Sequence, residues 1–446
     1  MAPAQIPSAR PTFLQSDRPL ARAALPLVRF LRIEAAGGIL LVGATVAALV
    51  WANSPWQASY TSFWATTIRV EVGTYVFEQD LTHVVNDLFM AVFFFVVGME
   101  IKRELVVGEL RDRRSLALPA MAALGGMIVP AAIYLAFNAS GAGSRGWGIP
   151  MATDIAFAVG VVTLLGGRVP GSVKVLLLTL AIVDDIGAIV VIAIFYSSSV
   201  SFGWLALAAA VVLTIVVLRR GRVWYHPIYV ALGVALWLCM FESGVHATIA
   251  GVVMGLLTPA RPFLPRVETE RIVDTLENQP ELQPDDVHRV SFMIAESVPL
   301  TERIERALHP WTSFVVVPVF ALANAGIELT GDTLSGGSSV ALGVVLGLVV
   351  GKTVGISLFS WVACRLGVAS LPSGAGWPQL VGVAALAGIG FTVSLFVAGL
   401  AFAPGSRTEE QAKVGILVAS VLAAAIGAVV LSVAGRRLPP EDGLAS

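Results

Sequence analysis

The chain has 446 residues, of which 56% are apolar and only 13% carry a charge, and its formal net charge is −1. This apolar content exceeds what a water-soluble core requires and indicates an integral membrane protein, while the near-zero net charge argues against a nucleic-acid partner. The two cysteines lie singly inside apolar segments, so they indicate neither a disulfide nor a metal site.

Apolar runs long enough to cross a membrane recur along most of the chain. A bilayer core about 30 Å thick needs about 20 apolar residues in a helix, so such runs bounded by charge, Gly or Pro are candidate spans. The sequence predicts an all-α integral membrane fold with about twelve transmembrane helices. The predicted spans are 35–52, 82–106, 115–138, 149–166, 173–197, 203–218, 226–241, 244–259, 309–328, 339–363, 377–402 and 412–434.

Most of the Lys and Arg residues gather in alternate loops between these spans. Cytoplasmic loops of membrane proteins are enriched in these residues. We therefore expect residues 1–34 to form a cytoplasmic N-terminal segment, residues 35–434 to form the membrane domain and residues 435–446 to form a cytoplasmic tail. The pattern predicts a multi-pass protein with both termini in the cytoplasm.

Two connections are long enough to have structure of their own. Residues 66–79 alternate apolar and polar side chains around Gly73, which predicts a β-hairpin on the extracytoplasmic side. An isolated hairpin is marginally stable, so we expect it to pair with something. Residues 261–308 are polar, rich in proline and of mixed charge, and they predict a cytoplasmic loop or linker.

Four charged residues lie inside apolar runs: Asp154, Asp184, Asp185 and Lys352. A charge at the centre of a membrane helix costs roughly 2.5–3.5 kcal/mol on insertion scales. Four such groups need mutual pairing or a function to explain them. A salt bridge that holds helices together would be a sufficient structural reason for Lys352, with an aspartate as its expected partner.

The three aspartates of this group lie at two points in the first half of the chain. In GIPMATDIAFAVG, residues 148–160, Pro150 and flanking glycines interrupt the helix, and Thr153 supplies a hydroxyl beside Asp154. In LTLAIVDDIGAIVVIAIF, residues 178–195, the adjacent aspartates Asp184 and Asp185 point about 100° apart, so they face different neighbours. The sequence predicts a broken helix at the first point and a carboxylate facing a cavity at the second.

The second half of the chain also has a charge inside an apolar run and an interrupted helix. In GLVVGKTVGISLF, residues 347–359, Lys352 lies among glycines that allow close approach of another helix. In ALAGIGFTVSLFVAG, residues 385–399, glycines predict a second broken helix. The two breaks fall in the fourth and eleventh spans, and the loop charges place the surrounding triplets of spans in opposite orientations. We therefore predict inverted repeats with two broken helices that cross, where Asp154 and Lys352 offset the charges of the half-helix ends.

The residues leave three functions open. A buried carboxylate that holds either a cation or a proton suits a secondary ion exchanger. A cation channel lined by acidic residues would have similar residues. An intramembrane enzyme with paired aspartates is less consistent, since the DDIGA sequence lacks the third aspartate of a DDxxD metal motif and no GxGD sequence accompanies it. We therefore expect a transporter and not an enzyme, with no cofactor.

Nine sequence signatures resemble those of the bacterial NhaA sodium/proton antiporter family, over roughly residues 30–435. The signatures are NDLFMAVFFFVVGMEIKREL at 86–105, GGMIVPA at 125–131, ATDIAFA at 152–158, LAIVDDIGAI at 180–189, SGVHAT at 243–248, LHPW at 308–311, FALANAG at 320–326, GKTVGISLF at 351–359 and GIGFTVSLF at 388–396.

This resemblance implies the roles of the buried charges. Asp185 would be the principal carrier of cation and proton, with Asp184 as its neighbour and as the partner of Lys352. The transported Na⁺ would bind at Asp185 and Asp184. Asp154 with Thr153 would compensate the helix crossing, and we count both among the predicted cation- and proton-binding residues, since oxygens near Thr153 can also bind a hard cation.

The resemblance also implies an electrogenic, pH-regulated exporter of Na⁺ or Li⁺ in exchange for H⁺, in the inner membrane of a prokaryote, for sodium and pH homeostasis. It implies a homodimer built partly through the 66–79 hairpin. The implied pH-sensing residues are Glu100, Arg103, Glu104, His246, Glu305 and His309. From the residues alone, Glu100 to Glu104 also fits a solvated helix end, the two histidines fit hydrogen-bonded scaffold positions, and Asp87 fits a cap or solvated group.

Overall fold

The structure is a computed structural model, and it describes residues 36–73, 75–111, 113–197, 200–221, 223, 225–262, 296–328, 338–372 and 374–435. Three predicted regions fall wholly or largely outside these ranges, and their predicted structure stays a prediction. They are the N-terminal segment 1–34, residues 263–295 of the predicted loop 261–308, and residues 436–446 of the predicted tail.

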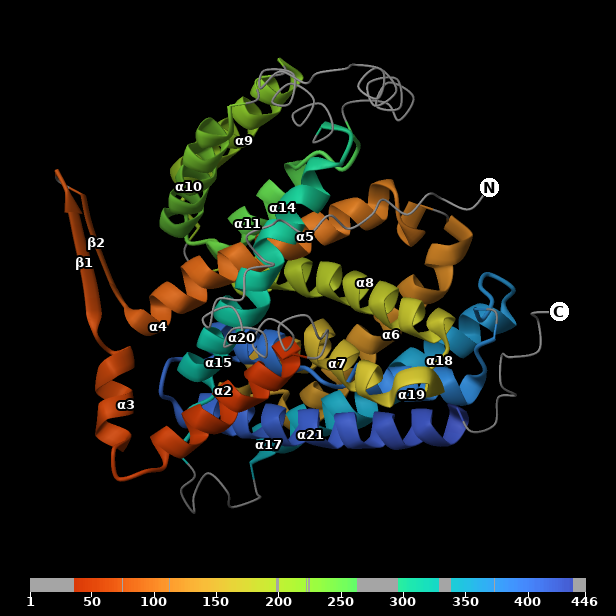
Figure 1. Ribbon diagram of the computed structural model, residues 1–446. Helices are drawn as coiled ribbons and strands as arrows, with labels where there is room; N and C mark the ends of the chain where they lie inside the picture. The colour runs from red at the N-terminus through yellow and green to blue at the C-terminus, as the bar shows by residue number, and fades with distance from the viewer. Residues whose placement is uncertain are drawn as a thin grey trace, which may run out of the picture.

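Long helices packed side by side make up most of the described chain, and one hairpin projects from the edge of the bundle (Figure 1). The first half comprises α2 (Ala36–Ala52), α3 (Gln57–Trp64), β1 (Thr67–Val72), β2 (Tyr75–Asp80), α4 (Leu81–Val84), η2 (Val85–Phe89), α5 (Met90–Val106), η3 (Glu109–Arg111), α6 (Arg113–Asn138), η4 (Ala142–Met151), α7 (Ile155–Leu165), η5 (Gly166–Arg168) and α8 (Gly171–Phe195).

The remaining elements follow without a further strand among the described residues. They are α9 (Phe202–Arg220), α10 (His226–Glu242), α11 (Thr248–Leu257), α14 (Leu300–Trp311), η6 (Thr312–Val316), α15 (Val317–Asn324), α17 (Ser339–Leu346), η7 (Gly347–Gly351), α18 (Lys352–Arg365), α19 (Trp377–Leu386), α20 (Phe391–Ala401) and α21 (Arg407–Gly435). The segments η2, η6 and η7 are single π-helical turns within longer helices, and η3, η4 and η5 are 3₁₀-helical.

The described helices confirm a multi-pass membrane fold. Seven of them are long and apolar enough to cross a membrane, or up to ten if each of three bent helix pairs counts as one span. Two shorter apolar helices, Pro227–Glu242 and Thr248–Leu257, also coincide with predicted spans. The number of twelve transmembrane helices stays a prediction.

Two predicted boundaries change. The predicted loop 261–308 extends too far, because α14 already begins at Leu300. Helix α14, LTERIERALHPW, is amphipathic and rich in Glu and Arg, so a search for continuous apolar runs misses its first turns. The hairpin predicted at 66–79 is present one residue further along, with Thr67 opposite Asp80 and Val70 opposite Phe77.

The two halves of the chain meet through close helix contacts, while the inverted repeats stay a prediction. The third and tenth predicted spans, α6 and α18, cross where Gly125 and Gly355 lie against each other, and a methyl group on either glycine would collide with the carbonyl of the other. This close approach was predicted for the glycines around Lys352. It brings Lys352, which opens α18, into the interior of the bundle.

The broken pair α19 and α20 lies at the centre of the bundle, since nearly every residue from 379 to 398 is buried. In contrast, only 11% of the most apolar stretch of α9 is buried within the protein. This distribution makes α9 an outward-facing helix and places the two helix breaks in the best-packed part of the molecule.

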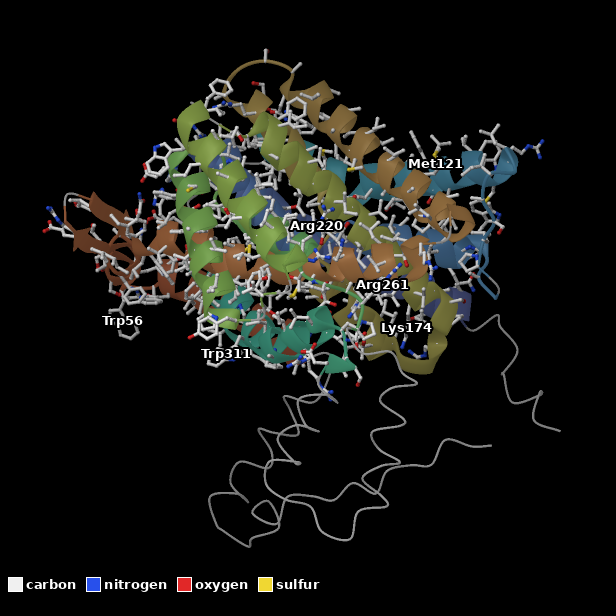
Figure 2. The ribbon with its side chains drawn as sticks, turned by 90° about the horizontal axis from the view of Figure 1, so that it is seen from above. Trp56, Met121, Lys174, Arg220, Arg261 and Trp311 are labelled. Atoms are coloured by element: carbon white, nitrogen blue, oxygen red, sulfur yellow. The ribbon has the colours of Figure 1, made fainter. Side chains whose placement is uncertain are left out.

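The ends of two helices support one part of the predicted loop arrangement. The Arg219 guanidinium donates through Nη1 to the carbonyl of Leu257 (2.7 Å), so α9 and α11 end close together. Figure 2 labels Arg220 and Arg261 in this region. Two of the predicted cytoplasmic loops therefore lie on the same side of the molecule, as the distribution of Lys and Arg predicts.

Candidate functional site

The first helix break forms around Thr153 and Asp154. The 3₁₀-helical segment η4 ends at Met151, the backbone at Asp154 is extended, and α7 begins at Ile155 with a 43° bend relative to η4. The Asp154 carboxylate caps α7 by accepting a hydrogen bond from the backbone amide of Phe157 (3.0 Å). A buried aspartate is therefore held at the N-terminus of a half-helix, as predicted.

The second break faces the first. Helix α19 ends at Leu386, α20 begins at Phe391, and the two helices are bent by 46°. The backbone amide of Asp154 donates to the carbonyl of Ile389 (2.6 Å), and the carboxylate of Asp154 accepts from the Thr392 amide (3.1 Å) and the Thr392 hydroxyl (2.6 Å). One carboxylate therefore binds the first turns of both α7 and α20.

This geometry explains why a charge at Asp154 is tolerated inside the bundle. A helix N-terminus carries about half a positive elementary charge, and here two of them converge on one carboxylate. On the other side of the second break, where α19 ends, the carbonyl of Ala387 accepts a hydrogen bond from the Thr153 hydroxyl (2.8 Å). Thr153 and Asp154 together satisfy backbone groups that the broken helices leave free.

Lys352 pairs with Asp184. The Lys352 ammonium donates to Oδ2 of Asp184 and to the Thr153 hydroxyl (3.1 Å), and the Thr153 hydroxyl also lies 2.6 Å from the same carboxylate oxygen. The side chains of Lys352 and Asp184 are 0% and 2% exposed. A buried ion pair thus links α8 to α18 beside the helix breaks, and the predicted aspartate partner of Lys352 is Asp184.

Asp185 is the least satisfied of the buried charges. Its residue is 4% exposed, and its Oδ1 has no hydrogen-bond partner among the described residues. Oδ1 of Asp184 is buried and without a partner in the same way. The groups within electrostatic range of Asp185 are Asp184, Asp154, Glu100 and Lys352. Adjacent carboxylate oxygens with free lone pairs are the ligands that a hard cation such as Na⁺ requires.

The predicted pH-sensing residues separate into two places. The Arg103 guanidinium of α5 pairs with Glu305 of α14 at 2.7 Å, and Glu100 lies within electrostatic range of Arg103, Glu104 and Glu305. His309, one turn beyond Glu305, is exposed. Glu100, Arg103, Glu104 and Glu305 therefore interact with one another along α5 and α14, and His309 lies one helical turn from Glu305.

His246 does not join that group. It lies between α10 and α11, where its Nε2 lies 2.8 Å from the carbonyl of Tyr196, at the end of α8. The Tyr196 hydroxyl in turn donates to the carbonyl of Arg145 (2.8 Å) and accepts from the amide of Gly148 (3.1 Å), both in η4. The contacts of His246 are those of a scaffold residue that supports the segment before the first break.

Sequence reasoning missed Thr392 and the carbonyls of Ala387 and Ile389. The motif GIGFTVSLF was noted for its glycines, but the threonine after the break was not considered as a partner for a carboxylate. The available signal was that each break is followed at once by a residue with a side-chain oxygen, Asp154 before α7 and Thr392 in the first turn of α20. The backbone carbonyls have no signal in the sequence.

Together, a multi-pass helical bundle and a buried acidic site at the meeting of two broken helices define an ion-coupled secondary transporter. Comparison with known proteins agrees. The family model described as Na⁺/H⁺ antiporter 1 matches residues 28–431, and the chain belongs to this family.

Proteins with high coverage on both sides carry the same description. The chain is similar to the Na⁺/H⁺ antiporter NhaA of Rhodopirellula baltica, with 51% identity over 92% of this chain and 94% of the relative. It is 49% identical to Na⁺/H⁺ antiporter NhaA 3 of Frankia alni over 93% and 90%, and 44% identical to the NhaA antiporter of Proteus mirabilis over 91% and 96%. These relatives are transporters rather than enzymes.

Proposed function

We propose that this protein exports Na⁺ in exchange for H⁺ across the inner membrane of a prokaryote, with Asp185 as the group that carries them in turn. The observation that supports this proposal is the partnerless oxygen of Asp185, buried beside the Lys352–Asp184 ion pair where the two broken helices meet. The name of the family agrees with the two exchanged ions.

Competition between the two ions follows from the site. A carboxylate oxygen that coordinates Na⁺ cannot hold a proton at the same time, so binding of one ion releases the other. The Asp184 carboxylate supplies a second oxygen, Oδ1, while its Oδ2 stays bound to Lys352 and Thr153. In this account Na⁺ is bound between the two adjacent carboxylates.

The ion pair provides a source for a second proton. A carboxylate and an ammonium 4 Å apart attract each other by about 4 kcal/mol at an effective dielectric of about 20. A Na⁺ bound at Asp184 weakens that attraction and favours loss of a proton from Lys352. Release of two protons for one Na⁺ makes the exchange electrogenic, and Li⁺, also a hard cation, is expected to use the same oxygens.

Alternating access then requires the breaks to move as a unit. Asp154 binds α7 to α20 through Phe157 and Thr392, so these two half-helices shift together. Asp184 and Asp185 lie on α8, which is unbroken from Gly171 to Phe195. We propose that movement of the crossed half-helices past α8 opens the carboxylates first to one side of the membrane and then to the other.

The proposal extends to the residues that respond to pH and to the surface through which two copies meet. The group of Glu100, Arg103, Glu104, Glu305 and His309 is proposed to respond to cytoplasmic pH, with both chain termini on that side. His246 is proposed to affect the pH profile through Tyr196 and η4. The protein is proposed to be a homodimer that contacts its second copy through the hairpin, for sodium and pH homeostasis.

The experiment uses everted membrane vesicles and a pH-sensitive dye. Addition of Na⁺ or Li⁺ to energised vesicles is expected to move protons out of the vesicle lumen and restore dye fluorescence, whereas K⁺ is not. Asp185→Asn is expected to insert into the membrane normally and to give no response. A full response in that variant would refute the assignment of Asp185, and no response from the native protein with any cation would refute the exchange.

A further inference from the structure

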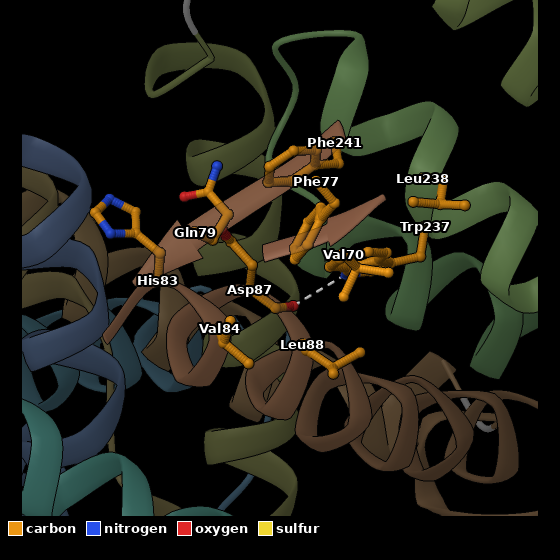
Figure 3. Close-up of a pocket in the computed structure, with 10 residues that line it drawn as sticks. All are labelled: Val70, Phe77, Gln79, His83, Val84, Asp87, Leu88, Trp237, Leu238 and Phe241. Carbon is orange, nitrogen blue, oxygen red and sulfur yellow. Dashed lines mark hydrogen bonds between the residues drawn. The ribbon is translucent and has the colours of Figure 1, made fainter. Parts of the chain in front are cut away.

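A cavity of about 440 Å³ lies away from the ion site, between the hairpin, the start of the second span and α10 (Figure 3). Its size falls within the roughly 300–1,000 Å³ typical of small-molecule sites. Val70 and Phe77 line it from the hairpin, Asp87 from η2, and Trp237 and Phe241 from α10. None of the buried charges of the ion site lines it, so the transport proposal does not use it.

Three aromatic rings form one wall of this cavity. The rings of Trp237 and Phe241 stack with centroids 5.6 Å apart, and the ring of Phe77 lies 6.2 Å from Trp237 and 5.7 Å from Phe241. The indole nitrogen of Trp237 donates to the backbone carbonyl of Asp87 (3.1 Å), the dashed line in Figure 3, which ties α10 to η2. Ring faces carry partial negative charge, so this wall favours a cation.

The charge at the cavity is also negative. Within the described part of the chain, the Asp87 carboxylate accepts no hydrogen bond and forms no ion pair, and it caps no helix, contrary to the cap that was one expectation from the sequence. The neighbouring His83 is bound to Asp80 through Nδ1 (2.8 Å). Arg69 lies on the opposite face of the hairpin, where it pairs with Glu71. His83 is within electrostatic range of Asp87 but is already paired with Asp80, and no Lys or Arg of the described residues pairs with Asp87.

We propose that this cavity binds a hydrophobic organic cation, such as an aromatic phosphonium or a quaternary ammonium compound. The Asp87 carboxylate supplies the counter-charge and the three rings supply cation–π contacts. A small metal ion fits this cavity poorly, because it needs several oxygen ligands. Apart from Asp87, the only polar side chains that line the cavity among the described residues are Gln79 and His83, and the rest are apolar or aromatic. A hydrophobic cation loses little hydration on entering, so charge and apolar surface act together.

The test measures binding of radiolabelled tetraphenylphosphonium to the purified full chain in a non-ionic detergent. Asp87→Asn removes the charge and keeps the shape, and Trp237→Leu removes one ring; each is expected to weaken binding by about tenfold, the scale of one desolvated cation–π or charge contact. Glu78→Gln, on the hairpin face that points away from the cavity, is the matched control and is expected to bind like the native protein. Asp185→Asn, in the ion site, is expected to bind normally as well.

Three results would overturn the proposal: native affinity in Asp87→Asn, loss of binding only in Asp185→Asn, or equal competition by the uncharged triphenylphosphine oxide. If Asp87→Asn or Trp237→Leu fails to fold, photolabelling of the native protein with a benzophenone-bearing quaternary ammonium decides. Labelled peptides from Leu81–Phe89 and His226–Glu242 support the cavity, and labelling elsewhere refutes it.

Discussion

The carboxylate of Asp154 holds Thr392 by two hydrogen bonds, one from its amide at 3.1 Å and one from its hydroxyl at 2.6 Å, and so connects helices that lie more than 200 residues apart in the chain. In the same break, the Asp154 amide binds the carbonyl of Ile389. Asp154 alone therefore makes three hydrogen bonds between the two interrupted helices.

Thr392→Val tests this connection, since it removes the hydroxyl and keeps the shape and the backbone amide. A hydrogen bond to a charged group contributes about 1.5–3 kcal/mol, so we expect a lower unfolding temperature in detergent and slower Na⁺-driven proton flux. The control is Thr214→Val, whose exposed hydroxyl bonds only to the carbonyl of Ala210 in its own helix. Equal unfolding temperatures for the two variants would show that the hydroxyl of Thr392 does not stabilise the crossing.

Because Lys352 and Asp184 form a buried ion pair, we expect the stability losses of their single variants not to add up in the double variant. Lys352→Gln leaves a buried carboxylate without its cation, and breaking such a pair costs about 3–5 kcal/mol. Asp184→Asn added to Lys352→Gln removes the second charge and is expected to restore much of the stability but not the ion exchange. Thermal unfolding of both single variants and the double variant gives the coupling. Strictly additive losses would mean that the two side chains do not stabilise each other.

The Arg103–Glu305 pair predicts a change of regulation with little change of stability. Because the Arg103 side chain is 34% exposed, the pair contributes at most about 1 kcal/mol. Glu305→Gln is therefore expected to unfold near the native temperature and to shift the pH dependence of Na⁺/H⁺ exchange. Arg306→Gln, on an exposed neighbour, is the control. An unchanged pH profile in Glu305→Gln would remove Glu305 from the proposed pH-sensing group.

If the hairpin forms the proposed dimer interface, removing it changes the oligomeric state. Thr67 and Asp80 face each other at its base, so an Asn-Gly turn in place of residues 68–79 closes the chain without moving α3 or α4. By light scattering in detergent, we expect the native protein to be a dimer and the shortened protein to stay folded and to be a monomer. A shortened protein that remains dimeric would place the interface elsewhere.

Much of this fold could be predicted because its signals are local. Apolar runs mark the spans, and Pro150, Gly388 and Gly390 mark the breaks. The cost of burying charge singled out Asp154, Asp184, Asp185 and Lys352, and all four are buried in the structure. The start of α14 was assigned to the loop because its first turns are charged on one face.

Other parts of the site depend on contacts that a single sequence does not contain. Thr392 binds Asp154 only because the two breaks meet, and His246 lies near Tyr196 rather than near Glu305 because α8 and α10 end together. A histidine and a glutamate that share one predicted role can therefore lie far apart. Residue type alone does not show which of the predicted pH-sensing residues lie together, whereas their positions in the structure do.

The central claim is that Na⁺ and H⁺ compete for the carboxylate of Asp185. The most direct measurement is proton release from the purified protein in weakly buffered solution when NaCl is added, read with a pH-sensitive dye against choline chloride. The native protein and the control Asp80→Asn are expected to acidify the solution, and Asp185→Asn is expected to lose this release. Undiminished proton release from Asp185→Asn would contradict the account and place the exchange site on another residue.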